Sequence, residues 1–175
     1  ILARIRRDSE NPDAIAQVRL FDELFPRHPY GRRTRGTLES VPAIGVEDMR
    51  GFVSGRLARA NLIVGAAGDV TPDELGRLLD AAFGAVPARA TPASVADVVP
   101  TLSARTIVVK TKVPQSAIAF AGPGLKRDDP DFYVALVLNH ILGGSGFTAR
   151  LHEEIREKRG LAYSAGTSLH PLRHS

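Results

Sequence analysis

The sequence predicts an α+β fold with helices packed on mainly antiparallel sheets. Two observations lead to this prediction. Helix-type apolar spacing recurs along both halves of the chain, and short apolar runs rich in Val, Ile and Ala lie between the helical segments, bounded by Gly, Pro and Asp. Neighbouring predicted strands are close enough in sequence to pair as hairpins. This pattern favours helices covering antiparallel sheets in both halves.

Two helices and one strand are expected before residue 71. An apolar stripe predicts a helix over residues 1–25, interrupted near Asn11-Pro12, because proline disrupts a helix interior. A second helix is expected over residues 46–57. The short apolar run NLIVGAAGDV, residues 61–70, then predicts a strand that ends in a Gly-Asp turn.

The next helix carries the clearest boundary signals in the chain. Thr71 is the expected N-cap, Pro72 occupies the first turn and Glu74 completes a capping box. Gly84 follows Phe83 as the expected stop. Residues 1–84 are therefore interpreted as one domain region.

A stretch without periodicity separates the two halves. Residues 85–103, AVPARATPASVADVVPTLS, are rich in Ala, Pro, Val and Ser and are interpreted as an interdomain linker. Residues 104–175 form the second domain region. In it we expect strands over residues 105–112, 115–124 and 161–169, a helix from Asp129-Pro130 to about Leu142, and a helix over residues 147–159 stopped by Gly160.

Composition restricts the classes of protein. The 175 residues, 43% of them hydrophobic, suffice for one large or two small domains, and no apolar run approaches the length of a membrane-spanning helix. The net charge of +4 is scattered except at GRRTRG, residues 31–36, and no aromatic-interleaved basic face indicates nucleic-acid binding. The absence of cysteine excludes disulfides and thiolate metal sites.

The sequence starts at Ile1, and its only methionine is Met49. This start indicates a piece of a longer protein.

Three stretches carry a combination of motifs: HPYGRRTRGTLESVPAIGVEDMRGFV at residues 28–53, NLIVGAAGDVTPDEL at 61–75, and LNHILGGSGFTARLHEEIREKRGLAYSAG at 138–166. In this order they resemble the M16 peptidases, the insulinase-like and mitochondrial-processing-peptidase-like enzymes. The resemblance covers nearly the whole chain, chiefly without the linker. It implies that residues 1–84 are the end of one M16-like α+β domain and residues 104–175 the start of a second, similar one.

The resemblance implies a zinc site that this sequence does not complete. The family's inverted motif, H-x-x-E-H, supplies two zinc ligands and a glutamate that activates water, and a later glutamate is the third ligand. No such motif occurs here, and ILARIRRDSENP, residues 1–12, places Arg4 at the later glutamate, or Ala3 with a shift of one residue. Neither side chain can serve as that ligand. We expect no metal ligand and no cofactor in this chain, and zinc in a partner subunit or an upstream half.

The stretch IREKRGLAYS, residues 155–164, matches the family's arginine and tyrosine, seven residues apart. The resemblance implies that Arg156 and Tyr163 face the zinc from the other half of the chamber. A tyrosine hydroxyl and a guanidinium can both donate to the negative charge that grows on a carbonyl oxygen under attack by water. Because Gly160 ends the helix, both side chains can point into one cavity. Without the resemblance they would be a solvated helix-end arginine and a half-buried strand tyrosine.

The glycine run LGGSGFTAR, residues 142–150, follows a predicted helix and lacks the lysine of a phosphate-binding loop. A helix C-cap with a hinge is one interpretation. Resemblance to the non-catalytic processing-peptidase subunit instead favours contact with substrate by Gly143, Gly144 and Gly146. The chain's histidines give no metal site: His140 and His152 are expected to make local hydrogen bonds, and Pro171 opposes an ordered helical pair of His170 and His174.

Two classes of function remain. The first is the non-zinc-binding subunit of an M16 metalloendopeptidase, inactive alone, that supplies Arg156 and Tyr163 for peptide binding and transition-state stabilisation. The second is a catalytically inactive structural relative, like the core subunits of a respiratory complex. Retention of both residues favours the first. The expected partners are a peptide substrate and a zinc-bearing M16 subunit in a heterodimer or larger oligomer, because incomplete sheets expose strand edges. We expect neither nucleic acid nor membrane as a partner, and the resemblance slightly favours the bacterial periplasm.

Overall fold

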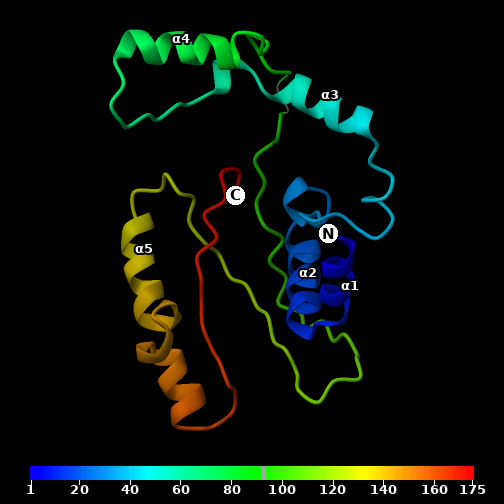
Figure 1. Ribbon diagram of the computed structural model, residues 1–175. Helices are drawn as coiled ribbons and strands as arrows, with labels where there is room; N and C mark the ends of the chain where they lie inside the picture. Colours follow the sequence, from blue (N-terminus) through cyan, green and yellow to red (C-terminus); the bar gives the residue numbers. More distant parts are fainter. Residues whose placement is uncertain (92–93) are drawn as a thin grey trace. The chain divides into compact units, whose positions relative to one another are not determined.

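The structure is a computed structural model that describes residues 1–91 and 94–175 (Figure 1). Its chain contacts form two units, residues 1–6 with 35–94 and residues 7–34 with 95–175. The α-helices are α1 (Leu2–Glu10), α2 (Pro12–Leu24), α3 (Val46–Arg56), α4 (Pro72–Phe83) and α5 (Phe132–Asn139). Shorter turns are the 3-10 segments η1 (Pro29–Gly31), η2 (Arg59–Asn61) and η4 (Gly146–Thr148) and the π-helical segments η3 (His140–Gly144) and η5 (His152–Glu157).

The predicted α+β fold with antiparallel sheets is wrong for this structure, because its described residues contain helices and no strand. A strand needs a ladder of hydrogen bonds to a neighbour, which a local apolar run cannot supply by itself. The segments expected as strands make only isolated backbone bonds, such as Thr167 N to Gly143 O at 3.3 Å. Many of their apolar side chains are exposed to solvent, among them Ile63 at 99%. The sheet-edge argument for an oligomer loses its basis in these residues.

The break predicted near Asn11-Pro12 is confirmed, because α1 ends at Glu10 and α2 begins at Pro12. Asn11 is the N-cap of α2, and its Oδ1 accepts a hydrogen bond from the amide of Ala14 at 3.0 Å. Proline fits the first helical position, where no backbone donor is needed. A single dipeptide thus divides one apolar stripe into two helices.

The boundary signals of α4 are also confirmed. Thr71 Oγ1 accepts from the amide of Glu74 at 3.3 Å, and Glu74 Oε2 accepts from the amide of Thr71 at 3.0 Å. The hydrogen bond from the Thr71 hydroxyl is the main reason that the pKa of Glu74 lies below its usual range. This reciprocal capping satisfies two amides that the helix itself cannot pair.

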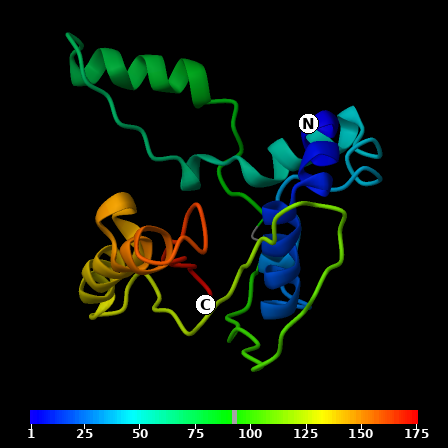
Figure 2. The same cartoon turned by 90° about the horizontal axis from the view of Figure 1, so that it is seen from below.

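In the second unit, α5 is shorter than the helix expected up to Leu142. Regular α-helical bonding ends at Asn139, and the chain continues through η3, η4 and η5. Figures 1 and 2 show α5 in yellow, the following helical turns in orange, and the segment towards the C-terminus running back beside them. Phe132 and Ala149 are buried in this unit. The irregular turns carry the site described below.

The same unit ties several distant segments together through Asp97. Its carboxylate lies 2.9 Å from both Lys126 Nζ and His174 Nδ1, and the amide of His174 donates to Tyr30 Oη at 2.9 Å. The hydrogen bond from Lys126, and next that from His174, lower the pKa of Asp97.

None of the helices in the described part of the chain has the length and apolar character of a membrane-spanning helix.

Candidate functional site

Arg156 and Tyr163 meet across the turn at Gly160. The guanidinium carbon of Arg156 lies 4.7 Å from the centre of the Tyr163 ring. Gly160 has φ 61°, a left-handed conformation that glycine adopts without steric cost, and its amide donates to Arg156 O at 2.9 Å. Leu161 N donates to Ile155 O at 3.0 Å, which folds the following segment back against the helical turn. The turn therefore brings into contact two residues that a continuous α-helix would hold about two turns apart.

The pair is open to solvent. Tyr163 is 82% exposed, and 31% of the Arg156 side chain is exposed. Phe147, 78% exposed, lies on the same guanidinium at 5.7 Å, so Arg156 contacts two aromatic rings. Cation–π contacts at exposed sites contribute about 0.5–1 kcal/mol each. They restrict the guanidinium through its face, without using its N–H groups as hydrogen-bond donors.

Glu157 connects Arg156 to a buried histidine. Its Oε1 lies 3.6 Å from Arg156 Nε and 3.4 Å from His152 Nε2. His152 is only 5% exposed, and its Nε2 is fully buried without a contact of hydrogen-bond geometry. The ring of Phe147 covers it edge-on at 5.1 Å. One carboxylate oxygen is thus shared between an accessible arginine and an enclosed imidazole.

The other acidic side chains of this turn are engaged elsewhere. Lys158 Nζ lies 3.0 Å from Glu153 Oε1 and 2.6 Å from Glu154 Oε1, and Arg159 Nη1 lies 2.6 Å from Glu154 Oε2. The Lys158 hydrogen bond, and next that of Arg159, lower the pKa of Glu154 to about 2. Glu154, and next Glu153, raise the pKa of Lys158. This pairing leaves Glu157 as the carboxylate beside Arg156.

The three candidate glycines lie in different surroundings. A Cβ on Gly143 would lie 2.5 Å from Thr167 Oγ1 and 2.6 Å from Thr167 N, so the returning segment packs directly on this backbone. A Cβ on Gly144 would lie 2.8 Å from Asn139 Nδ2. Gly146 has φ 65° and open space where a Cβ would stand. The first two permit close packing, and the third turns the chain into Phe147.

The described residues do not provide the set of side-chain donors that a zinc site of this family needs. Arg4, expected at the position of the family's glutamate ligand, lies exposed on α1, and so does the alternative Ala3. No three His, Cys, Asp or Glu side chains within residues 1–91 and 94–175 group as a metal site. His174 contacts Asp97, and His170 Nε2 lies 3.3 Å from Ser168 Oγ. Residues 1–91 and 94–175 therefore hold no complete zinc donor set.

Sequence reasoning missed Phe147 and Glu157. Phe147 directly follows Gly146 in the glycine-rich run, and an aromatic residue after such a run was a usable signal in the sequence. No signal of regular periodicity marks Glu157, because positions five apart do not face each other on an α-helix. His152 and Glu157 approach in η5, where the hydrogen-bonding pattern is π-helical.

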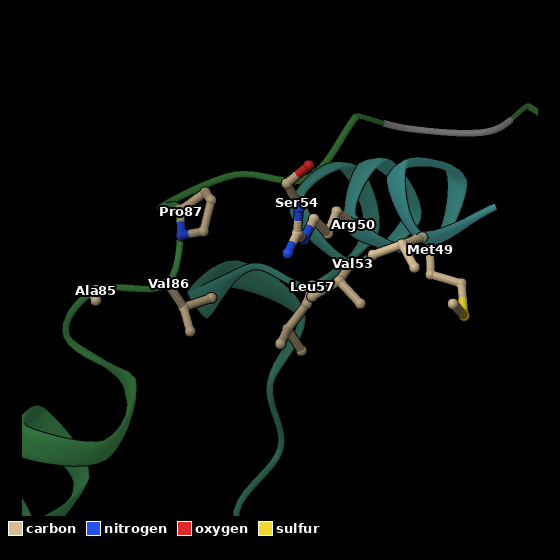
Figure 3. A pocket seen from close by; sticks show the side chains of 9 residues that line it. Met49, Arg50, Val53, Ser54, Leu57, Ala85, Val86 and Pro87 are labelled. Carbon is tan, nitrogen blue, oxygen red and sulfur yellow. The ribbon is translucent and has the colours of Figure 1, made fainter.

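An apolar groove of about 510 Å³ lies in the other unit (Figure 3). Figure 3 shows its lining from α3 and the segment after α4. Its apolar lining includes Met49, Val53, Leu57 and Val86. Arg50 is its charged residue, and it pairs with Glu47 at 2.6 Å. The lining includes the Ser54 hydroxyl but no carboxylate, imidazole or thiol that could activate it.

The family pattern described as the peptidase M16 inactive domain matches residues 43–175. The chain belongs to the M16 peptidase family. This confirms the resemblance drawn from the three motif stretches. The match includes every residue of the Arg156 site described above.

Individual relatives agree with this M16 assignment. An uncharacterized zinc protease of Streptomyces coelicolor is 32% identical over 94% of this chain and 37% of its own length. A probable mitochondrial-processing peptidase subunit beta of Schizosaccharomyces pombe is 27% identical over 79% of this chain and 32% of its own length. A non-peptidase homolog of Helicobacter pylori is 29% identical over 94% and 38%, respectively.

A solved structure is similar as well. The crystal structure of a peptidase M16 inactive domain from Pseudomonas fluorescens matches with a TM-score of 0.74 and 27% identity, covering 98% of this chain and 41% of that one. This M16 chain therefore spans well under half the length of the relatives it matches.

Proposed function

We propose that this M16 chain binds a peptide and supplies Arg156 and Tyr163 to a peptidase site whose zinc is held by a partner subunit or by an upstream half. The observation that carries this proposal is the 4.7 Å contact of the Arg156 guanidinium with the exposed ring of Tyr163. Family resemblance supports the roles, and the shared turn supplies the geometry. The chain alone hydrolyses no peptide.

Each side chain has a defined chemical task. When water attacks the scissile carbonyl, its oxygen gains negative charge, and the Tyr163 hydroxyl donates a hydrogen bond to it. Donors that are already oriented stabilise such charge more than they stabilise the ground state. Arg156 presents a planar set of N–H groups that holds the peptide carbonyl or carboxylate next to Tyr163. Stacking on Phe147 and Tyr163 limits the motion of the guanidinium.

The glycine loop is proposed as the neighbouring wall of the peptide site. Gly146 provides an open backbone beside Phe147, where an extended peptide can approach without meeting a side chain. Gly143 and Gly144 hold this loop in place through their packing on Thr167 and Asn139. One relative is named as a subunit of a processing peptidase, which supports a two-subunit arrangement for this chain.

The chain offers matched controls for a test. Tyr133, 66% exposed, also lies beside an arginine, with the Arg127 guanidinium carbon 5.5 Å from its ring, but outside the site. In the full-length protein assembled with a zinc-bearing M16 partner, Tyr163→Phe is expected to lower kcat about 10²–10³-fold. Arg156→Lys is expected to lower kcat/KM, because lysine lacks the planar fork. Tyr133→Phe and Arg127→Lys should leave kcat and KM unchanged.

The competing proposal is that this chain is a structural M16 relative that takes no part in catalysis. Similarity to the non-peptidase homolog of Helicobacter pylori favours it. It predicts that all four variants assemble and that peptide hydrolysis is unaffected by each of them, or absent from every assembly. The kinetic comparison of Tyr163→Phe with Tyr133→Phe therefore separates the two functions.

A further inference from the structure

His152 is the one buried polar residue found in the described part of the chain. Burial of an imidazole nitrogen without a partner is unfavourable, so such atoms call for an explanation. Its Nε2 lies 3.4 Å from Glu157 Oε1 and has no partner of hydrogen-bond geometry. The Phe147 ring contacts the His152 ring edge-on at 5.1 Å between centroids. The position is thus oriented towards one carboxylate that also serves Arg156.

The surroundings contain few other charges that can replace Glu157. Within η5, Arg156 shares Glu157, while Glu153 and Glu154 pair with Lys158. η4 contributes the uncharged ring of Phe147, and the returning segment contributes Tyr163, stacked on Arg156. Two groups therefore compete for the Glu157 carboxylate. Arg156 is always positively charged, whereas His152 is positively charged only when its imidazole is protonated.

We propose that His152 is a positioning residue that sets, through Glu157, how strongly Arg156 is held away from the peptide. A neutral His152 with its proton on Nδ1 directs a lone pair at Glu157, and the carboxylate then pairs with Arg156. A protonated His152 donates Nε2–H to Glu157. The carboxylate is drawn to the imidazolium, and the Arg156 guanidinium is released for the peptide carbonyl or carboxylate. This inference rests on the proposed peptide-binding role of Arg156.

The coupling between His152 and Glu157 can be measured without catalysis. In the full-length protein labelled with ¹³C at histidine, His152 is identified by the signal lost in His152→Gln, and its pKa is read from the pH dependence of its ring shift. Glu157→Gln removes the carboxylate that lies 3.4 Å from Nε2 and is expected to shift this pH dependence. Glu153→Gln, the same change at the carboxylate paired with Lys158, should change it much less. Equal shifts in both variants, or a ring that does not titrate in the folded protein, would overturn the proposal.

The consequence for peptide binding is measured on the enzyme assembled with its zinc-bearing partner. KM is expected to rise about two- to fivefold as pH increases through the His152 titration, the range that an exposed ion pair allows. His152→Gln keeps a donor but cannot titrate, and Glu157→Gln removes the shared carboxylate. Both should flatten the KM profile, whereas Glu153→Gln should keep it. A profile that stays unchanged in His152→Gln would overturn the proposal.

The two sets of measurements separate the failure of this inference from the failure of the proposed function. If Tyr163→Phe and Arg156→Lys impair hydrolysis while Glu157→Gln leaves the His152 titration unchanged, the peptidase role stands and the coupling is wrong. If Glu157→Gln shifts the His152 titration but no variant affects hydrolysis, the coupling exists and the peptidase role is wrong. In that case His152 does not regulate peptide binding, and the inference fails with the function.

Discussion

Helix α4 and the segment from η3 to η5 both begin and end near residues that the sequence marks as boundaries, yet they differ in regularity. α4 is a single α-helix closed at its N-terminus by the reciprocal bonds of Thr71 and Glu74. The η3–η5 segment alternates π-helical and 3-10 turns; it contains one positive-φ glycine, Gly146, and a second, Gly160, follows it. The regular element has no buried residue, whereas the irregular one buries His152.

This difference shows which element is determined by interactions between neighbours in the sequence and which by contacts with a distant segment. Every bond that defines α4 joins residues within one or two turns, so its sequence is sufficient to specify it. The η3–η5 segment is shaped by Thr167, which packs on Gly143 from more than twenty positions away in the chain. π-Helical turns occur frequently at functional sites, and here one such turn brings His152 and Glu157 together.

The largest expected contrast comes from adding one methyl group to each region. Gly143→Ala would place a Cβ 2.6 Å from the backbone of Thr167 and should destabilise the segment by about 1–3 kcal/mol. Gly76→Ala, in the open interior of α4, should stabilise its helix by about 0.5–1 kcal/mol, because alanine loses less conformational freedom. Local opening free energies from amide hydrogen exchange measure both. The same sign of change at both positions would contradict the distinction between the two regions.

A smaller effect is expected from the cap of α4. Thr71→Ala removes the hydroxyl that accepts from the Glu74 amide, and should reduce local stability by about 1 kcal/mol. Thr71→Ser keeps that oxygen and serves as the control. Hydrogen exchange in the first turn of α4 should speed up in Thr71→Ala and hardly change in Thr71→Ser. Equal exchange in the two variants would show that the cap is dispensable.

The smallest effect concerns the exposed ion pairs of the η3–η5 segment. The pKa of Glu154 is lowered from 4.5 to about 2 by Lys158 and Arg159, so this carboxylate stabilises the folded turn above pH 4.5. That contribution should disappear as the pH falls from about 4.5 towards 2, because protonation removes both ion pairs. Solvent and salt screen these pairs, so the change is small. Exchange rates in the turn should lose this acid dependence in Glu154→Gln, and persistence of the dependence would assign it to another group.

Sequence reasoning succeeded where a signal and its effect lie close together. The break at Asn11-Pro12 and the capping box of Thr71 and Glu74 were both predicted and are both present. The α+β fold was not found, because an apolar run such as residues 105–112 indicates an extended chain but does not provide its pairing partner. For the site, the motif identified Arg156 and Tyr163, but their separation and contact with Phe147 required the turn at Gly160.

The sequence by itself determined the M16 family, the capped helix α4 and the residues proposed for peptide binding, because each rests on the identity and order of nearby side chains. Only the tertiary structure decided that Glu157 stands between Arg156 and His152. A regular α-helix would not place residues 152 and 157 on one face. The π-helical hydrogen bonds of η5, with the segment from Gly160 folded back against them, place both groups at one carboxylate oxygen. Chemistry at this site therefore depends on hydrogen bonds and packing that no local pattern encodes.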